Sequence, residues 1–147
     1  MRMNAWMIAV LAAGMAVPAQ AQTEYHRYNI VDGGYRDRVL GQGLWRVTAS
    51  SDASSGFGFA AKMAVYRSAE LAKAAGYSHI QILKHKVMIR QSRPDYRMIG
   101  QSAELKVRGV HSPSQPLACE MKPGSRCMVY AADDILTKLG PTVLVDH

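Results

Sequence analysis

Cysteine is scarce in this 147-residue sequence, and neither of its two cysteines lies near the N-terminus. The lipid attachment of bacterial lipoproteins needs an N-terminal cysteine, so the sequence excludes it. Long apolar runs are missing as well. Residues 5–17 form a run of about 13 residues, whereas a helix that spans a bilayer needs roughly 20. We therefore expect neither a lipid anchor nor a membrane-spanning helix.

Catalytic signatures are also missing. The sequence holds 11 acidic side chains, and none forms an obvious catalytic pair. The H-E-x-x-H metalloprotease motif and the G-x-S-x-G nucleophile elbow are both absent. His79 and His85 are placed on one predicted strand, roughly 20 Å apart at about 3.3 Å per residue, so they cannot share a metal ion. We expect no metal site and no cofactor, and we assign no catalytic residue.

The N-terminus, in contrast, follows the plan of a secretory signal. Arg2 supplies a positive charge, and the apolar run 5–17 has the length of a signal core. Pro18 then breaks the helix, and Ala19-Gln20-Ala21 is a small-x-small cleavage site. The pattern predicts an exported protein.

We expect residues 1–21 to be removed by a cut between Ala21 and Gln22, which leaves residues 22–147 as one periplasmic or secreted domain. The whole chain has a net charge of +7, and the cut would leave 17 basic against 11 acidic side chains. Such a surface favours anionic partners: lipid headgroups, lipopolysaccharide, a wall polymer or an acidic envelope protein. Export argues against nucleic acid, and solubility alone is an alternative reason for the dispersed charge.

Cys119 and Cys127 flank a turn-like segment, Glu-Met-Lys-Pro-Gly-Ser-Arg. In an oxidising compartment, a cysteine pair at this spacing predicts a disulfide. Two alternatives stay open. The pair could act in redox chemistry, or it could join Met121 and Met128 in a soft-ligand site for Cu(I).

Four segments carry clear secondary-structure patterns. Residues 44–50 and 101–110 alternate between apolar and polar side chains, which predicts two half-buried strands. Residues 59–75 are rich in Ala, Met, Leu, Lys and Glu and lack proline, which predicts a helix. Residues 78–91 predict a long strand whose apolar positions change parity. One face of a strand cannot bury both sets without a slip, so we expect either a β-bulge near 83–85 or two short strands.

The remaining elements have weaker patterns. We expect an irregular extended segment at 35–40, a long loop at 111–126, a second helix at 128–139 and a short last strand at 142–145. The order strand, helix, strand, strand, helix, with the last strand as an option, predicts the α+β class. Its architecture would be a small antiparallel sheet with one long and one short helix packed on one face.

Basic residues recur along the predicted strands. Lys84, Lys86, Arg90, Lys106 and Arg108 could share the solvent-facing side of the sheet, with Arg46 nearby. Such a face would suit an anionic polymer or a headgroup. Because the bulge leaves the parity open, the shared face is a hypothesis.

Two further features each have a structural and a functional interpretation. The segment Gly56-Phe57-Gly58-Phe59-Ala60-Ala61 matches G-x-G-x-x-A between a strand and a helix, so it is either an entry loop or an anion site. Arg67 and Glu70 lie three apart on the predicted helix. They form an exposed ion pair, or they fix the helix to a neighbouring loop such as 33–37.

Three groups of short segments stand out. They are Gly33-Gly34-Tyr35-Arg36-Asp37 with Trp45-Arg46-Val47, Tyr66-Arg67-Ser68-Ala69-Glu70-Leu71 with Gly76-Tyr77, and Tyr130-Ala131-Ala132-Asp133. Together they resemble a family of small, uncharacterised proteobacterial envelope proteins, many of which are lipoproteins. Relatives commonly carry a lipid-acceptor cysteine at the cleavage site and often a cysteine where Ser68 stands. Membrane anchoring therefore does not carry over, and the resemblance implies an envelope protein without naming a catalytic residue.

These observations favour an exported cell-envelope protein with a basic surface, acting as a non-enzymatic binding or structural protein. One alternative is a small periplasmic enzyme of hydrolytic type, with a site in the loops 50–58 or 111–126. Another is a redox or stress accessory protein that uses Cys119 and Cys127.

Overall fold

The computed structural model describes residues 25–30, 33–114, 119–125 and 127–144. Residues 1–21, with the predicted export signal and its cleavage site after Ala21, lie outside the described residues. Within the described ranges, no helix is long and apolar enough to cross a bilayer.

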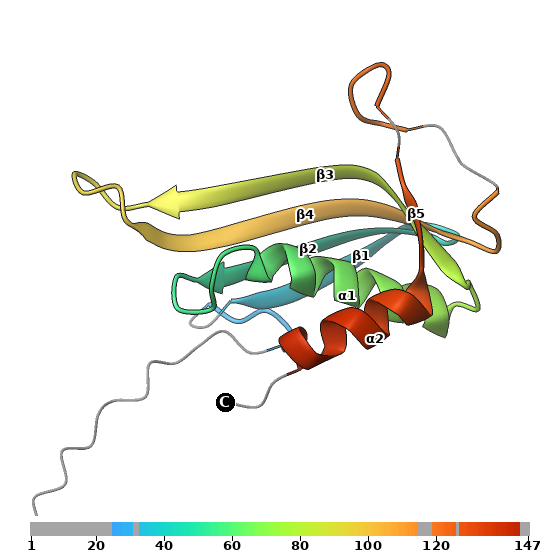
Figure 1. Cartoon of the computed structure of the whole chain (residues 1–147), viewed down its shortest axis with the longest axis horizontal. Coiled ribbons are helices and arrows are strands. Elements are labelled where there is room, and N and C mark those ends of the chain that lie inside the picture. Colours follow the sequence, from blue (N-terminus) through green and yellow to red (C-terminus); the bar gives the residue numbers. More distant parts are fainter. Residues whose placement is uncertain (1–24, 31–32, 115–118, 126, 145–147) are drawn as a thin grey trace, which may run out of the picture.

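The described residues form one antiparallel sheet and two helices. In chain order, the elements are β1 (Gly34–Gly41), β2 (Leu44–Asp52), α1 (Phe59–Ala74), β3 (His79–Gln91), β4 (Met98–Val110), β5 (Val129–Ala131) and α2 (Ala132–Val143). The strands lie in the order β1-β2-β4-β3-β5, and both helices cover the same face of the sheet (Figure 1). This arrangement confirms the predicted α+β class with its one-sided helical layer.

The core lies between α1 and the middle of the sheet. Trp45, Val47 and Ala49 of β2 are buried, because alternate side chains of a strand point to the same face. Their register partners on β4, in the same order, are Val107, Leu105 and Ala103. The fully buried alanines of α1 are Ala60, Ala64, Ala69 and Ala72. These small side chains let the helix lie close to the sheet, so that the apolar residues of β2 and β4 are removed from water.

The predicted bulge in β3 is confirmed. The register against β4 shifts between Ile82, which pairs with Val107, and Lys84, which pairs with Lys106. Leu83 is the extra residue between them, and it is buried. The bulge moves the alternation by one position. From Lys84 onward, the even-numbered residues of β3 therefore lie on the face of the sheet away from the helices.

The segment predicted to be irregular at 35–40 is a regular strand, which corrects that prediction. As β1, it pairs with β2 along most of its length. Alternation then puts Tyr35 and Asp37 on the face that carries the helices, while Arg36 and Arg38 point the other way.

Two predictions for the C-terminal part are wrong. The helix predicted at 128–139 begins only at Ala132, because Val129–Ala131 pairs with the first residues of β3 as the edge strand β5. The short strand predicted at 142–145 is wrong for its described part, because α2 continues through Pro141. Pro141 removes one N–H from the last turn, and the helix ends two residues later at Val143.

Candidate anion-binding site

The face of the sheet that carries no helix, which we call the open face, gathers the predicted basic residues. One row of register partners crosses it: Arg36 on β1, Thr48 on β2, Glu104 on β4 and Lys86 on β3. Residues two positions away on each strand share this face. The predicted residues Lys84, Lys86, Arg90, Lys106 and Arg108 all lie on it. The strand register thus places all five residues on the open face, but at different positions along the strands.

A group of three predicted lysines lines one cavity of about 280 Å³: Lys84, Lys86 and Lys106. Two carboxylates share this cavity. Lys106 Nζ lies 2.7 Å from Glu120 Oε1, and Arg46 Nε lies 3.9 Å from Glu104 Oε1. Because these carboxylates offset part of the positive charge, this cavity is the weaker candidate for an anion.

A second cavity of about 310 Å³ lies on the open face, nearer to the turn between β3 and β4. It is lined by two arginines, Arg36 and Arg90, and by three hydroxyl residues, Thr48, Ser50 and Ser102, beside Tyr28. Among the residues that the structure describes, no acidic side chain lines it. Guanidiniums present paired N–H donors, and hydroxyls add further donors, which suits a phosphate or carboxylate group. We call this site the Arg36–Arg90 cavity.

Neighbouring groups shape the positions of both guanidiniums of the Arg36–Arg90 cavity: Tyr28 contacts that of Arg36, and Gly100 leaves room for that of Arg90. The guanidinium carbon of Arg36 lies 3.8 Å from the centre of the Tyr28 ring, a cation–π contact. Tyr28 is tied to β1, because its N–H donates to the carbonyl of Tyr35 at 2.7 Å. Arg90 lies against Gly100, where an added Cβ would come within 2.6 Å of Arg90 Nη2. Glycine at position 100 thus provides the room that this guanidinium occupies.

The remaining predicted cation, Arg108, joins neither cavity. It pairs with Gln81 near the opposite end of β4. Its Nε is buried and has no hydrogen-bond partner within the described part of the chain. An unpaired buried donor costs free energy in the folded protein, and Arg108 lines neither of these two cavities.

The sequence prediction omits Arg36, because it treats 35–40 as irregular. The sequence does contain a pattern that indicates a strand here: the polar Arg36 and Arg38 alternate with the apolar Tyr35 and Val39. Strand alternation would have placed the two arginines together on one face. The hydroxyl residues of the cavity carry no such signal, because serine and threonine are common at exposed strand positions.

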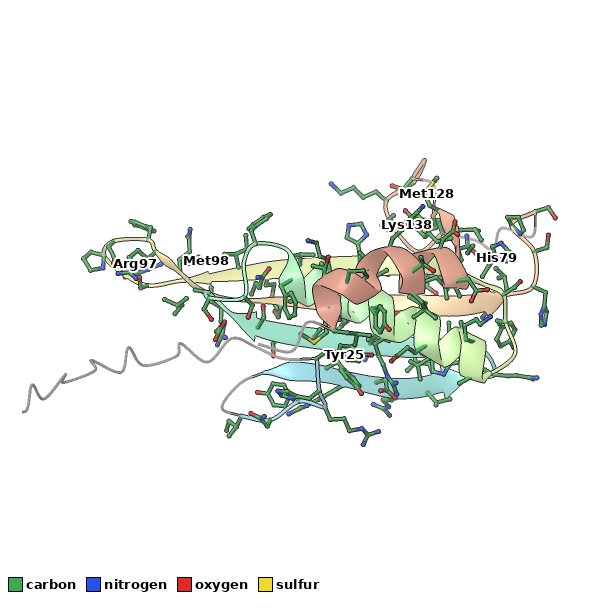
Figure 2. The ribbon with its side chains drawn as sticks, turned by 60° about the horizontal axis from the view of Figure 1, so that its bottom comes forward. Tyr25, His79, Arg97, Met98, Met128 and Lys138 are labelled. Carbon is green, nitrogen blue, oxygen red and sulfur yellow. A yellow bond between two sulfur atoms is a disulfide. The ribbon has the colours of Figure 1, made fainter. Side chains whose placement is uncertain are left out.

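A cluster of charged and aromatic side chains fastens β1 to α1 on the opposite face of the sheet. Arg67 donates from Nε to Asp37 on β1 and from Nη1 to Glu70, both at 3.0 Å. The hydroxyl of Tyr25, which lies between β1 and α1 (Figure 2), donates to the same Glu70 carboxylate. The two interpretations of Arg67 and Glu70 combine, except that the ion pair is part-buried and not exposed. They form an ion pair within the helix, and Arg67 also fixes the helix to the 33–37 segment.

The protonation states of this cluster follow from its burial and its charges. Burial raises the pKa of the Tyr25 hydroxyl, and the hydrogen bond to Glu70 raises it further, because ionisation would put two negative charges together. Burial alone would lower the pKa of Arg67. The hydrogen bonds to Glu70 and Asp37 outweigh that effect, so the pKa of Arg67 is raised overall. Near neutral pH the cluster therefore keeps a neutral tyrosine and a charged arginine.

Cys119 and Cys127 form the predicted disulfide, with their Cα atoms 5.3 Å apart. The loop that they close lies over the bulge of β3, on the side of the sheet away from the helices (Figure 1). The N–H of Glu120 donates to the carbonyl of Leu83 at 3.1 Å, and the side-chain amide of Gln81 donates to the carbonyl of Cys127 at 3.2 Å. Because the two sulfurs are bonded to each other, they do not provide the thiolates that the alternative Cu(I) site needs.

The G-x-G-x-x-A segment is held by one buried side chain. The side-chain oxygen of Gln101 accepts from the N–H of Gly58 at 2.8 Å, and its amide nitrogen donates to the carbonyl of Gly56. The N–H of Gly58 is therefore already used, which favours the entry-loop interpretation over an anion site. In the described ranges, no three His, Cys, Asp or Glu side chains gather as a metal site would require.

A comparison of the chain with protein-family models, with curated proteins and with solved structures gave no match. The resemblance to envelope proteins stays a prediction from the segments quoted above. The assignment of the site therefore depends on the geometry of the open face.

Replacing Tyr25 with phenylalanine tests the cluster that holds β1. We expect Tyr25→Phe to lower the free energy of unfolding at pH 7 by about 1–2 kcal/mol, because a hydrogen bond to a carboxylate is lost. In the unfolded chain the hydroxyl ionises near its ordinary pKa of 10.0, whereas the folded state keeps its proton. Stability of the unsubstituted protein should therefore fall as pH rises above that value.

Urea unfolding at several pH values between about 7 and 11 measures both effects, since the ordinary tyrosine pKa of about 10 lies inside that window. The decline above pH 10 should be smaller in Tyr25→Phe. The exposed Tyr130 provides the control, and Tyr130→Phe should leave both the stability and its pH dependence close to the unsubstituted protein. Equal pH profiles in all three proteins would contradict the role given to Tyr25.

Replacing both cysteines with serine tests whether the bridge is structural. We expect Cys119→Ser/Cys127→Ser to lower the free energy of unfolding by about 2–3 kcal/mol, because the unfolded chain gains loop entropy. Thermal unfolding measures this loss. Anion binding below the transition should persist, since the Arg36–Arg90 cavity contains neither cysteine. A double variant that lost a biological activity of the protein but kept its thermal stability would instead support the redox alternative.

Proposed function

We propose that the protein is an exported cell-envelope protein that binds anionic groups on its open face and catalyses no reaction. The observation that carries this proposal is the Arg36–Arg90 cavity, where two guanidiniums and three hydroxyls line a space free of acidic side chains among the described residues. The proposed export depends on the pattern of residues 1–21 and on the resemblance. Phosphate groups on headgroups or polymers of the envelope are the ligands that this donor set suits.

The size of the cavity supports a small anionic group as the ligand. Pockets that enclose small molecules typically measure about 300–1,000 Å³, and this one, at about 310 Å³, lies at the lower limit. A single phosphate ester fits that scale better than a large cofactor does. Arginine pairs also favour planar or tetrahedral oxyanions, because each guanidinium can donate two N–H bonds in parallel.

The composition of the cavity supports binding over hydrolysis. Hydrolytic sites usually contain a general acid or base such as His, Asp or Glu, and the described lining of the Arg36–Arg90 cavity contains none. In the 50–58 loop, the hydroxyls of Ser54 and Ser55 donate to Asp52 at 2.8 and 2.9 Å. These hydrogen bonds make a turn that leads into α1, which is a structural role.

Replacing the two cavity arginines tests the proposed function. We expect Arg36→Gln/Arg90→Gln to weaken the binding of glycerol phosphate by about tenfold or more, because charge-assisted hydrogen bonds contribute about 1.5–3 kcal/mol each. Two-dimensional NMR titration with glycerol phosphate measures the dissociation constant and also shows which residues respond. Binding should weaken as salt is added, since the site is open to solvent.

The matched control removes the same charge from the helical side of the molecule. Lys62 on α1 and Lys138 on α2 are both exposed, and Figure 2 shows Lys138 on the outer surface of its helix. Lys62→Gln/Lys138→Gln should leave the dissociation constant almost unchanged. If both double variants lost the same affinity, the effect would come from net charge, and the cavity would not be the site.

Export is tested separately, on the protein purified from its native host. Intact-mass analysis should find a chain that begins at Gln22, in the periplasmic or secreted fraction, because the predicted signal ends at Ala21. A variant with Ala19→Arg/Ala21→Arg should stay uncleaved, since small residues are needed at these positions. A native chain that keeps Met1 and remains in the cytosol would overturn the envelope assignment.

A further inference from the structure

The outer half of the β3–β4 hairpin extends beyond the layer of helices. Figure 1 shows the two strands continuing past α1, and Figure 2 shows Arg97 and Met98 at the far end of the molecule, away from both helices. All residues of β3 from Lys84 to Gln91 are exposed. We call residues 87–99, which end this projection, the hairpin end.

The hairpin end exposes apolar side chains. Five large ones are between 46% and 67% exposed: Val87, Met88, Ile89, Tyr96 and Ile99. A group of this size in one short segment differs from the scattered apolar residues that normal surfaces carry. The side chain of Phe57 is 76% exposed and belongs to the loop that Gln101, the register partner of Ile89, holds in place.

These apolar side chains lie on both faces of the hairpin. Val87 pairs with Ala103 and Ile89 pairs with Gln101, whose side chains are buried on the face that carries the helices. Met88 lies between Val87 and Ile89, so it points to the open face. A flat protein surface would cover one face of the hairpin, whereas a bilayer can surround both faces of an inserted element.

The charges of the hairpin end favour an anionic surface. It carries Arg90, Arg93 and Arg97, against one acidic residue, Asp95. Asp95 accepts a hydrogen bond of 2.5 Å from the hydroxyl of Ser92, within the turn. Basic residues next to an apolar segment are attracted to anionic headgroups, while the apolar side chains enter the boundary of the acyl region.

We propose that the hairpin end docks at the headgroup boundary of an anionic phospholipid bilayer, where the Arg36–Arg90 cavity, at the same level of the sheet, lies among the lipid phosphates. This inference rests on the proposed function and names the partner of the same face. Arg90 links the two regions, because it lines the cavity and lies three residues from Val87 on β3. Ser102 links them as well, since it lines the cavity and pairs with Met88. The occupant of the apolar patch is therefore a lipid surface.

Co-sedimentation with vesicles tests the proposal on the full chain. The vesicles contain phosphatidylcholine alone or a mixture of phosphatidylglycerol and phosphatidylcholine. We expect the protein to sediment with the mixed vesicles and to remain in solution with the neutral ones. Val87→Ser/Ile89→Ser/Ile99→Ser should weaken vesicle binding at least about tenfold, because three apolar side chains lose their burial in the bilayer.

Two controls separate this effect from misfolding and from the cavity itself. Val39 is also exposed, but it lies on β1, and Val39→Ser should bind the vesicles normally. The triple variant should keep the affinity of the unsubstituted protein for soluble glycerol phosphate. If the triple variant kept this affinity and also bound the mixed vesicles normally, the docking proposal would be overturned, but the proposed function would stand.

A fluorescent reporter provides a second measurement, which detects contact between the hairpin end and the acyl chains directly and does not need a variant that binds less well. Ile99→Trp places an indole in the hairpin end, and phosphatidylglycerol with brominated acyl chains should quench it. The same lipid should quench Val39→Trp much less. Both variants also contain the buried Trp45, so the emission of the unsubstituted protein is subtracted. Equal quenching of the two introduced tryptophans, or none, would overturn the insertion.

Analytical ultracentrifugation tests the competing occupant, a second copy of the chain. The unsubstituted protein should remain monomeric in the absence of vesicles. A dimer that the triple variant loses, together with an absence of vesicle binding, would show that protein covers the patch and would overturn the lipid proposal. If the unsubstituted protein bound neither vesicles nor glycerol phosphate, the proposed function would be overturned as well.

Discussion

The contact between Arg67 of α1 and Asp37 of β1 is the interaction on which the candidate site depends. It joins the helical layer to the outermost strand of the sheet, at 3.0 Å and with both side chains largely buried. Arg36 and Asp37 are neighbours, and their side chains leave β1 on opposite faces. Fixing Asp37 against the helix therefore fixes the backbone from which Arg36 reaches the open face. Removing Arg67 would leave the largely buried carboxylate of Asp37 without this partner, which is costly, whereas removing Asp37 would leave Arg67 paired with Glu70.

The segment Gly33 to Asp37 shows how closely structural and binding roles can lie in one stretch of sequence. Gly34 adopts a φ of 106°, and an added Cβ would lie 2.9 Å from Nδ1 of His26. Glycine there lets the 25–30 segment lie beside β1. That segment brings Tyr25 to the helical face and Tyr28 to the open face. The resemblance described above includes residues 33–37. The packing of these residues is enough to explain why they occur together in one stretch of sequence.

Local patterns predicted the elements that have strong periodicity. The alternation of apolar and polar residues in 44–50 and 101–110 predicted two strands, and the shift of the apolar positions within 78–91 predicted the bulge. Both patterns depend only on residues that are close in the sequence. The three residues of β5 have no such local signal. They become a strand because the start of β3 offers free backbone groups at the edge of the sheet. Strand order is a long-range property too, so the sequence could not bring Arg36 of β1 and Arg90 of β3 to one cavity.

Net charge is a poor guide to where an anion binds on this molecule. Near the bulge, the cations of the open face share their cavity with Glu104 and Glu120, the second of which comes from the disulfide loop. Toward the hairpin end, the described lining of the Arg36–Arg90 cavity has no such carboxylate. A carboxylate beside a cation both lowers the local potential and competes for its donors. An adjoining cavity that Arg90 also lines contains Asp52. Binding is therefore expected where the lining itself has no carboxylate, and the apolar hairpin end extends from the same part of the sheet.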